Sequence, residues 1–418
     1  MGKKETNFKQ TDIGLIPHDW EVVSLGEHSR KIGSGKTPRG GESVYTLSGI
    51  PFVRSQNVGY GRMHLKGISY ISEALHNEQK SSEIDVNDVL LNITGASIGR
   101  CSVADKYVVG GNINQHVCII RLAPSSFISN YLCNFLLSNN GQEQIQLLQS
   151  GGSREGINFG QVGNIKVPLP PLKEQKRIAE VLSHFDEHID NLVALLEKRK
   201  QVKAATMHAL LSGTTRLPGF TQPWAETKLG DICEFRTGYT PSKSVRSFWE
   251  NGTIPWFRMD DIRENGRKLL RAKQYVTEEA VKGGGLFEAG SFILATTATI
   301  GEHAWLIADS LANQRFTNLK IRKSLKNTLS AHFFFYYLYI IDEYCKRNTK
   351  TGTFAAVDIY DLKAFKVPTP PLKEQSAIAS VLSNMDRGIE ALEEQIEKYR
   401  QMKEGAMEEL LTGKVRLV

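Results

Sequence analysis

The sequence has few cysteines, no long hydrophobic run and no opening apolar segment. Its five cysteines lie far apart without Cys-x-x-Cys spacing, which excludes a disulfide framework and a zinc ribbon and favours a reducing compartment. The longest apolar stretch, residues 331–341, is shorter than the roughly 18 residues that a membrane-spanning helix needs. Residues 1–6 are mostly polar, unlike a secretory signal. We therefore expect a cytoplasmic protein without membrane contact.

Common catalytic motifs are also missing. The chain has no Gly-x-Ser-x-Gly elbow, no His-Glu-x-x-His motif, no complete dinucleotide fingerprint and no Asn-Pro-Pro-aromatic stretch of the kind found in amino-methyltransferases. Scattered carboxylates and lysines leave a nuclease site open on pattern alone. The sequence nevertheless favours a protein that binds rather than catalyses, with no metal ion and no cofactor of its own.

Two partial motif matches do not change this interpretation. Residues 33–37 resemble the end of a phosphate-binding loop, but the first glycine of that motif would fall at Arg30, and Pro38 interrupts the expected helix. Residues 184–188 fit the inverted zinc-protease pattern His-x-x-Glu-His, but the matching second copy of this segment lacks both histidines. We therefore expect His184 and His188 to be solvated helix residues.

Length and charge set broad limits on the fold and on the partner. With 418 residues, 40% of them hydrophobic, the chain can bury two cores of ordinary domain size and carry connecting helices. Its formal net charge of +7 is compatible with an anionic partner such as nucleic acid.

A segment in the middle of the chain recurs near its end. Residues 166–175 read Lys-Val-Pro-Leu-Pro-Pro-Leu-Lys-Glu-Gln, residues 366–375 differ from them at one position, and the two copies end at Gly213 and Gly413. Roughly half of the positions are identical over about fifty residues, far beyond what shared helix composition gives. The chain is therefore two copies of one unit.

Shorter matches recur upstream of these segments, and the sequence between them differs freely. The matching positions are Trp20 and Trp224, Gly35–Pro38 and Gly238–Pro241, Ile50–Arg54 and Ile254–Arg258, Thr94–Gly99 and Thr296–Gly301, Asn114-Gln115 and Asn313-Gln314, and Gly152 and Gly352. Each half thus consists of a variable domain followed by a nearly constant segment.

The constant segments predict long helices with a coiled-coil seam. Apolar residues recur at alternating spacings of four and three after a Pro-Pro pair, at Ile178, Leu182, Phe185, Ile189, Leu192 and Leu196, and at Ile378, Leu382, Met385, Ile389, Leu392, Ile396, Tyr399 and Leu410. Forty helical residues would span about 60 Å. Because neither helix can bury its seam alone, we expect the two to pair antiparallel. The alternative is that each helix packs flat on its own domain.

The variable parts predict mixed α and β structure. Short β-rich segments bounded by Gly, Asn and Asp alternate with helical stretches near 127–149 and 329–345. The expected fold class is α+β, with two mixed α/β domains separated by two long helices that pair as an antiparallel coiled coil. The expected boundaries are 1–165 and 217–365 for the domains and 166–216 and 366–418 for the helical regions.

These duplicated motifs resemble the specificity subunits of type I restriction-modification systems. The Pro-Leu-Pro-Pro-Leu-Lys-Glu-Gln stretch at 168–175 and its repeat are similar to that family's two conserved regions. The shared Gly-x-Thr-Pro, Ile-Pro-x-x-Arg and Asn-Gln positions are similar to the framework of its two target recognition domains. The resemblance covers essentially the whole chain.

The resemblance implies a non-catalytic, sequence-specific DNA-binding subunit. Each recognition domain would read one half of a bipartite, asymmetric site in double-stranded DNA, and the helices would set the spacer. The helices would dock two modification subunits, which bind S-adenosylmethionine and methylate adenine. Two restriction subunits would supply ATP- and Mg-dependent translocation and cleavage, so that the chain serves both methylation and defence against foreign DNA.

Candidate site residues follow from the loops and from the repeated helix starts. Polar side chains on loops match the hydrogen-bonding edges of bases, and the expected DNA-binding residues are Arg39, Arg54, Gln56, Asn57, Arg154, Lys243, Arg246, Arg258, Asp260, Arg267 and Lys350. Arg54 and Arg258 occupy matching positions, which favours a phosphate contact or a structural salt bridge. The shared Asn-Gln pairs are expected to hold loop backbone. The expected partner-docking residues, taken to be exposed, are Lys173, Glu174, Gln175, Lys373, Glu374 and Gln375.

Two other functions stay open. One is a recognition subunit of the same construction that serves a combined methyltransferase-nuclease system, which a co-purifying chain would identify. The other is a coiled-coil scaffold without DNA binding, which a gel shift with random duplex DNA would separate from the rest.

Overall fold

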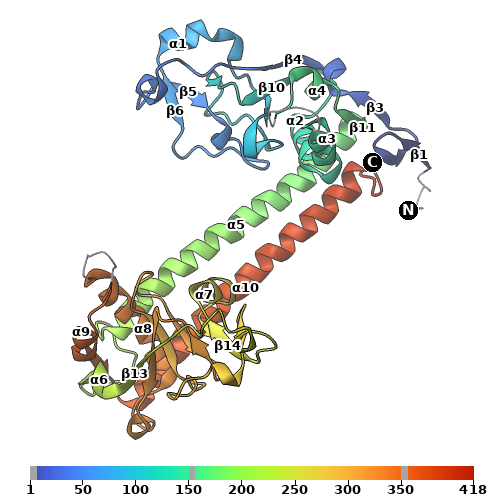
Figure 1. The fold of residues 1–418 in the computed structure, drawn as a ribbon. Coiled ribbons are helices and arrows are strands. Elements are labelled where there is room, and N and C mark those ends of the chain that lie inside the picture. The colour runs from blue at the N-terminus through green and yellow to red at the C-terminus, as the bar shows by residue number, and fades with distance from the viewer. Residues whose placement is uncertain (1–6, 150–155, 350–355) are drawn as a thin grey trace. The chain divides into compact units, whose positions relative to one another are not determined.

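The computed structural model describes residues 7–149, 156–349 and 356–418. The chain divides into two compact units (Figure 1). Unit 1 consists of Met1–Ala194 and Glu394–Val418, and unit 2 consists of Leu195–Glu393. Each unit therefore takes part of both repeated helical segments, and the four-segment division expected from the repeat remains a prediction.

The repeated segments form two helices of 40 residues, α5 (Leu172–Leu211, green) and α10 (Leu372–Leu411, red) (Figure 1). Both begin directly after a Pro-Pro pair, as the sequence predicts. Both end before a glycine with a left-handed backbone, Gly213 at φ 73° and Gly413 at φ 69°, which a residue with a Cβ adopts only with strain. The two predicted long helices, their starts after Pro-Pro and their ends before a glycine are confirmed.

The helices run antiparallel inside each unit. In unit 1, Lys403 of α10 donates to both carboxylate oxygens of Asp186 of α5 at 2.7 Å, and the ring of His188 contacts that of Tyr399 at 4.3 Å. In unit 2 the same pairing occurs with the partners exchanged, because Lys203 of α5 bonds Asp386 of α10. Residue numbers fall along α10 as they rise along α5, so the predicted antiparallel pairing is confirmed.

The alternative was that each helix packs on its own domain. Only the first turns of each helix do so. Ile178 and Leu182 belong to the main hydrophobic core of unit 1, and Ile378 and Leu382 belong to that of unit 2. The ends of the opposite helices, at Leu410 and Leu210, reach the same two cores. Each core thus contains the start of one long helix and the end of the other.

A buried glutamate fixes this arrangement in each unit. Glu174 is 2% exposed; it accepts hydrogen bonds from Arg416 at 2.8 and 2.9 Å and from the indole of Trp20 at 3.2 Å. Glu374 is 0% exposed and accepts from Arg216 and from Trp224 in the same way. We call these two sets the glutamate clamps. Each clamp joins the start of one long helix to the segment that follows the other helix.

The unit 1 domain places two sheets beside two helices. The first sheet has the order β4 (Ser29–Ser34), β10 (Val117–Leu122), β7 (Val89–Asn92), β8 (Cys101–Val103), all antiparallel. The second has the order β6 (Ser69–Ile71), β5 (Ile50–Val53), β9 (Asn112–Ile113). Helix α2 (Ser129–Leu137) buries most of its apolar residues, and helix α3 (Asn139–Gln149) buries Ile145, in the core shared with the first sheet.

Smaller elements complete unit 1. They are the hairpin of β1 (Phe8–Thr11) and β2 (Gly14–Pro17), the pair of β3 (Glu21–Ser24) and β11 (Lys166–Leu169), and the short helices α1 (Glu73–Glu78) and α4 (Phe159–Gly163). Strand β11 leads into α5, so the pairing with β3 fixes where the long helix begins.

The unit 2 domain repeats this plan. Its larger sheet has the order β13 (Cys233–Thr237), β20 (Phe316–Ile321), β17 (Phe292–Ala295), β18 (His303–Leu306), β15 (Lys268–Leu269), and its smaller sheet has the order β16 (Tyr275–Val276), β14 (Ile254–Phe257), β19 (Leu311–Ala312). Helix α8 (Ala331–Arg347) covers the larger sheet with a run of buried aromatic residues. The pair of β12 (Ala225–Lys228) and β21 (Lys366–Thr369) leads into α10; the remaining helices are α6 (Leu229–Ile232), α7 (Met259–Asn265) and α9 (Ile359–Ala364). The expected α+β class is confirmed.

The apolar run at 331–341 lies within α8. Within the described ranges, none of the helices is both long and apolar enough to cross a membrane.

The first prediction concerns the clamp of unit 1. Replacing Glu174 by Gln should lower the free energy of unfolding by about 2–3 kcal/mol, because a neutral amide accepts the charged hydrogen bonds of Arg416 poorly in a buried site. Urea denaturation of the full chain measures this. The exposed neighbour variant Lys173→Gln is the control and should change stability by less than about 0.5 kcal/mol. Equal effects of the two variants would contradict the role of the clamp.

Candidate nucleic-acid interface

The shared Asn-Gln pairs hold the shared Gly-x-Thr-Pro loops in both units. Gln115 Oε1 accepts from the Thr37 amide at 2.8 Å, and Gln314 Oε1 accepts from the Thr240 hydroxyl at 2.5 Å. Asn114 Oδ1 accepts from the amide of His116 at 3.1 Å, two residues further on. The prediction that these residues hold loop backbone is confirmed for Asn114, Gln115 and Asn313, whereas Gln314 bonds a side chain of its loop.

The glycines of these loops are required by close packing. A Cβ on Gly35 would lie 1.7 Å from the carbonyl oxygen of Ile113, and one on Gly238 would lie 2.2 Å from that of Asn313. Both distances are below any real Cβ contact, so a larger residue would push the loop off the strand end. The two loops are therefore fixed in place, and we call them the framework platforms.

Arg54 and Arg258 occupy equivalent positions, as the repeat predicts. Each backbone amide is capped three residues later, Arg54 by Asn57 Oδ1 at 3.0 Å and Arg258 by Asp261 Oδ2 at 2.7 Å. The guanidinium of Arg54 lies over the ring of Tyr45, whereas Arg258 lies 3.7 Å from Asp260. Because both side chains are only partly exposed, a phosphate contact and a structural role both remain compatible with their positions.

The other predicted DNA-binding residues fall into three groups. Arg39, Gln56, Lys243, Arg246 and Asp260 are exposed on loops or at a helix start and remain predictions. Arg154 and Lys350 lie outside the described residues. Asn57 and Arg267 are engaged within the chain, which favours a structural role: Asn57 is 1% exposed and donates to the carbonyl of His64 at 2.9 Å, and Arg267 pairs with Asp342 at 3.0 Å.

The expected exposure of the docking residues is wrong at four of six positions. Glu174, Gln175, Glu374 and Gln375 are buried, whereas Lys173 and Lys373 are exposed. Gln175 accepts from the Ile128 amide at 2.9 Å and donates to the Pro170 carbonyl at 2.9 Å, and Gln375 makes the equivalent bonds. The Lys-Glu-Gln repeat is thus explained by internal contacts of each unit. The two lysines remain predicted docking residues.

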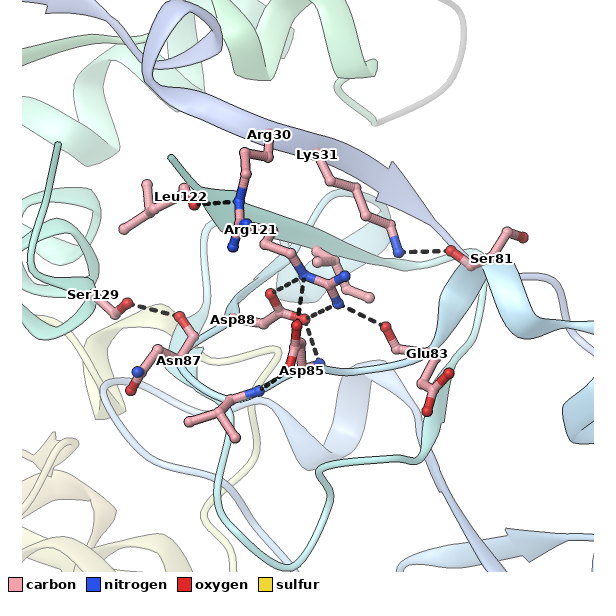
Figure 2. Close-up of polar contacts among 12 residues, drawn as sticks. Arg30, Lys31, Ser81, Glu83, Asp85, Asn87, Asp88, Arg121, Leu122 and Ser129 are labelled. Atoms are coloured by element: carbon pink, nitrogen blue, oxygen red, sulfur yellow. Dashed lines mark hydrogen bonds and ion pairs between the residues drawn. The ribbon is translucent and has the colours of Figure 1, made fainter. Parts of the chain in front are cut away.

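A charged cluster that the sequence did not reveal lies where β10 ends and β7 begins in the first sheet of unit 1 (Figure 2). Arg121 of β10 forms two hydrogen bonds of 2.8 Å to Asp88, which is 0% exposed, and a third of 3.0 Å to the Glu83 carbonyl. The bonds to Asp88 raise the pKa of Arg121. Burial, with a smaller effect of the nearby Arg121 charge, lowers the pKa of Lys31. Because the donors of Arg121 are largely engaged, the cluster is a structural tie.

The two motif look-alikes have no matching geometry. His184 and His188 are exposed on α5, and no group of three His, Cys, Asp or Glu side chains that could hold a metal ion occurs among the residues described. Gly33 and Ser34 end strand β4, and residues 35–38 continue as a loop where a phosphate-binding motif needs a helix.

Unit 2 contains a buried histidine beside a buried carboxylate. His303 of β18 is 0% exposed, and its Nδ1 lies 2.6 Å from Oδ2 of Asp342 on α8. Burial lowers the pKa of His303 below its ordinary 6.5, although Asp342 opposes this effect. In unit 1 the corresponding strand position is occupied by Cys101. Cys101 of β8 pairs with Leu91 of β7, just as His303 of β18 pairs with Leu294 of β17. The site is therefore specific to unit 2.

The second prediction follows from the lowered pKa. Below pH 6.5 the unfolded chain binds a proton at His303 before the folded chain does, so the free energy of unfolding should fall as the pH drops, by at most about 1.4 kcal/mol per pH unit. The variant His303→Gln cannot titrate there. Its stability deficit relative to the parent chain, measured by urea denaturation at pH 7.5, 6.5 and 5.5, should therefore shrink toward pH 5.5. A constant deficit would contradict the assignment.

Comparison with known proteins supports one family. Residues 17–202 and 221–399 each match the type I restriction modification DNA specificity domain. The EcoprrI specificity subunit of Escherichia coli is 49% identical over 142 residues, which cover 34% of this chain and 35% of that protein. The MjaX specificity subunit of Methanocaldococcus jannaschii, described as putative, is 25% identical over 432 residues, covering 99% of this chain and 98% of that protein.

Solved structures show the same fold. A chain from a type I R-M system, solved in work on its complex assembly and conformational transition, aligns with a TM-score of 0.66 at 20% identity over 96% of this chain and 99% of its own. The S subunit from M. genitalium aligns with a TM-score of 0.55 at 16% identity, over 94% of this chain and 96% of that one. At these identities the likeness concerns the fold.

Proposed function

The chain belongs to the type I restriction modification DNA specificity family, and we propose that it is the non-catalytic subunit that selects the DNA site for methylation and restriction. The single observation that carries the proposal is the duplicated plan. Each unit holds the same framework platforms, the Gly-x-Thr-Pro and Asn-Gln loops, and carries exposed polar residues elsewhere in its loops that differ between the copies. Two equal frameworks with different surfaces suit two unlike half-sites in double-stranded DNA.

The division of contacts follows from what the two copies share. Exposed residues that differ, such as Arg39, Gln56, Lys243 and Asp260, are proposed to read base edges. The shared Arg54 and Arg258 are proposed to bind phosphates, which are common to every target. A net charge of +7 favours such contacts.

The remaining parts of the complex are proposed from family membership. Two modification subunits would dock on the long helices, one near each of the exposed Lys173 and Lys373. They would bind S-adenosylmethionine, and two restriction subunits would bind ATP and Mg. The alternative partner is a combined methyltransferase-nuclease, because a chain with two repeated recognition units could direct such a partner equally well.

The third prediction tests independent reading by the two domains. Replacing residues 17–165 by the matching domain of a relative should change the methylated sequence in one half-site only. Sequencing of methylated bases in a host that expresses the hybrid with the modification subunit measures this. The reciprocal hybrid, with residues 217–365 exchanged, is the matched control and should change the other half. An assembled hybrid that alters both halves would refute independent reading.

The fourth prediction concerns the spacer. Both α5 and α10 contribute residues to both units, so we propose that their length sets the distance between half-sites. Adding seven residues after Leu196 and seven after Ile396 keeps the seam in phase and lengthens each helix by about 10 Å. At about 3.4 Å per base pair, the preferred spacer should grow by roughly three base pairs, with both half-site sequences retained.

A spacer of three more base pairs also rotates the groove by more than a quarter turn, so activity should fall unless the DNA twists to compensate. The control is an insertion of seven residues into one helix only, which breaks the pairing. A folded, assembled double insertion that still prefers the original spacer would show that the helices do not set the distance.

A further inference from the structure

Each unit contains a Gly-Arg pair that ties its variable segment to a helix. In unit 1, Gly61 has φ 79° and Arg62 bonds Asp190 of α5. In unit 2, Gly266 has φ 73° and Arg267 bonds Asp342 of α8. Both pairs follow the shared arginine at the end of β5 or β14. The left-handed glycine turns the chain so that the next side chain points back toward its own unit.

In the unit 2 pair the aspartate is buried and the arginine is partly exposed. The side chain of Asp342 is 4% exposed and that of Arg267 is 27% exposed, with Nη1 and Oδ2 at 3.0 Å. His303 contacts the same oxygen at 2.6 Å, and the guanidinium of Arg267 lies 4.5 Å from the ring centroid of Tyr339. The other oxygen of Asp342 is buried without a hydrogen-bond partner in the described part of the chain. The contacts of Asp342 with Arg267 and His303 therefore use only one of its two carboxylate oxygens.

Backbone contacts extend this tie to the whole segment 258–273. The amide of Trp305 donates to the Arg267 carbonyl at 2.7 Å, where β15 runs parallel to β18. Asp261 is 0% exposed; it caps the Arg258 amide and accepts from the Lys273 amide at 2.7 Å. The segment is thus fixed at both ends and near its middle, and the exposed side chains of α7 stand between these points.

The unit 1 pair differs in burial. The side chains of Arg62 and Asp190 are 50% and 48% exposed. An exposed ion pair contributes little to stability, whereas loss of one partner of a buried pair leaves a charge without compensation. Both pairs join an arginine that follows a positive-φ glycine to an aspartate, on α5 in unit 1 and on α8 in unit 2, and they differ in exposure, so Arg62 and Asp190 serve as an exposed control.

We propose that Asp342, with His303 behind it, is a positioning residue for target recognition: it holds Arg267, and through Arg267 it fixes segment 258–273 for reading of one half-site without touching DNA. This inference rests on the proposed function of the chain. It reassigns Arg267 from a DNA contact to the link between the reading segment and α8.

The test is a double-mutant cycle in the full complex with the modification subunit. Asp342→Asn, Arg267→Gln and the double variant are compared on duplexes that carry each single mismatch in either half-site. Each single variant should lower discrimination against mismatches in one half-site by about tenfold, the order of one base contact. The double variant should lose no more than either single variant, because both changes break the same tie. Discrimination in the other half-site should stay unchanged.

A direct contact of Arg267 with DNA gives different results. In that case Arg267→Gln alone would lower discrimination or reduce the dependence of binding on salt, and Asp342→Asn would leave both unchanged. That outcome would overturn the proposal. So would additive losses of discrimination in the double variant, unchanged discrimination in all variants, or a loss of discrimination in both half-sites. The exposed pair supplies the control, since Arg62→Gln and Asp190→Asn should change discrimination by less than about twofold.

Two measurements keep the test decisive if Asp342→Asn fails to assemble. Arg267→Gln leaves Asp342 with its His303 contact, so this variant can be tested alone. Lower discrimination in one half-site at unchanged salt dependence of binding supports the proposal, and unchanged discrimination overturns it. Arg267→Lys, which keeps the charge, should recover part of the discrimination if the tie is ionic, and no recovery counts against it.

Hydrogen exchange separates failure of this inference from failure of the proposed function. In the free full chain, Arg267→Gln should speed amide exchange in residues 258–273 at least tenfold while β17 and β20 stay protected. If the parent complex methylates no bipartite site, the proposed function fails whatever the exchange result. If the parent complex is specific and exchange in the variant is unchanged, only the positioning role fails.

Discussion

The burial of one carboxylate in each unit is the constraint on which the rest of the structure depends. Glu174 and Glu374 lie at the start of a long helix, where they would be costly without partners. Each finds an arginine and a tryptophan from segments far away in sequence. Because the arginine follows the end of the opposite helix, satisfying the charge also fixes the antiparallel register. The same buried carboxylate therefore fixes the position of the seam, the domain core and the strand that leads into the helix.

Much of this could be predicted from the sequence because the repeat is strong where the helices are. The spacing of Ile178, Leu182 and Ile189 predicts a seam, and glycines predict both helix ends. The contacts of Gln115 and Gln314 could also be anticipated, since residues shared by both copies cannot read two different targets. In each case a local pattern or the comparison of the copies carried the information.

The errors have a common physical cause. Charged residues at a helix start normally face solvent, so the Lys-Glu-Gln repeat predicts an exposed docking surface. Glu174 is buried because Arg416, more than two hundred residues away in sequence, reaches it. The pairing of Arg267 with Asp342 could likewise not be read from the sequence, and the DNA contact expected of Arg267 remains a prediction. Ion pairs between residues far apart in sequence follow no helix or strand periodicity, so they cannot be predicted from a single sequence.

The composition of unit 1 has a consequence for synthesis on the ribosome. Its first 194 residues emerge before any of unit 2, yet its compact form also includes residues 394–418. At about 5–20 residues per second the ribosome needs roughly 10–40 s to make the stretch between these parts. During that time Glu174 lacks Arg416 and the seam of α5 lacks its partner. Unit 2, although translated later, is therefore complete first, and unit 1 closes only after residues 394–418 have been made.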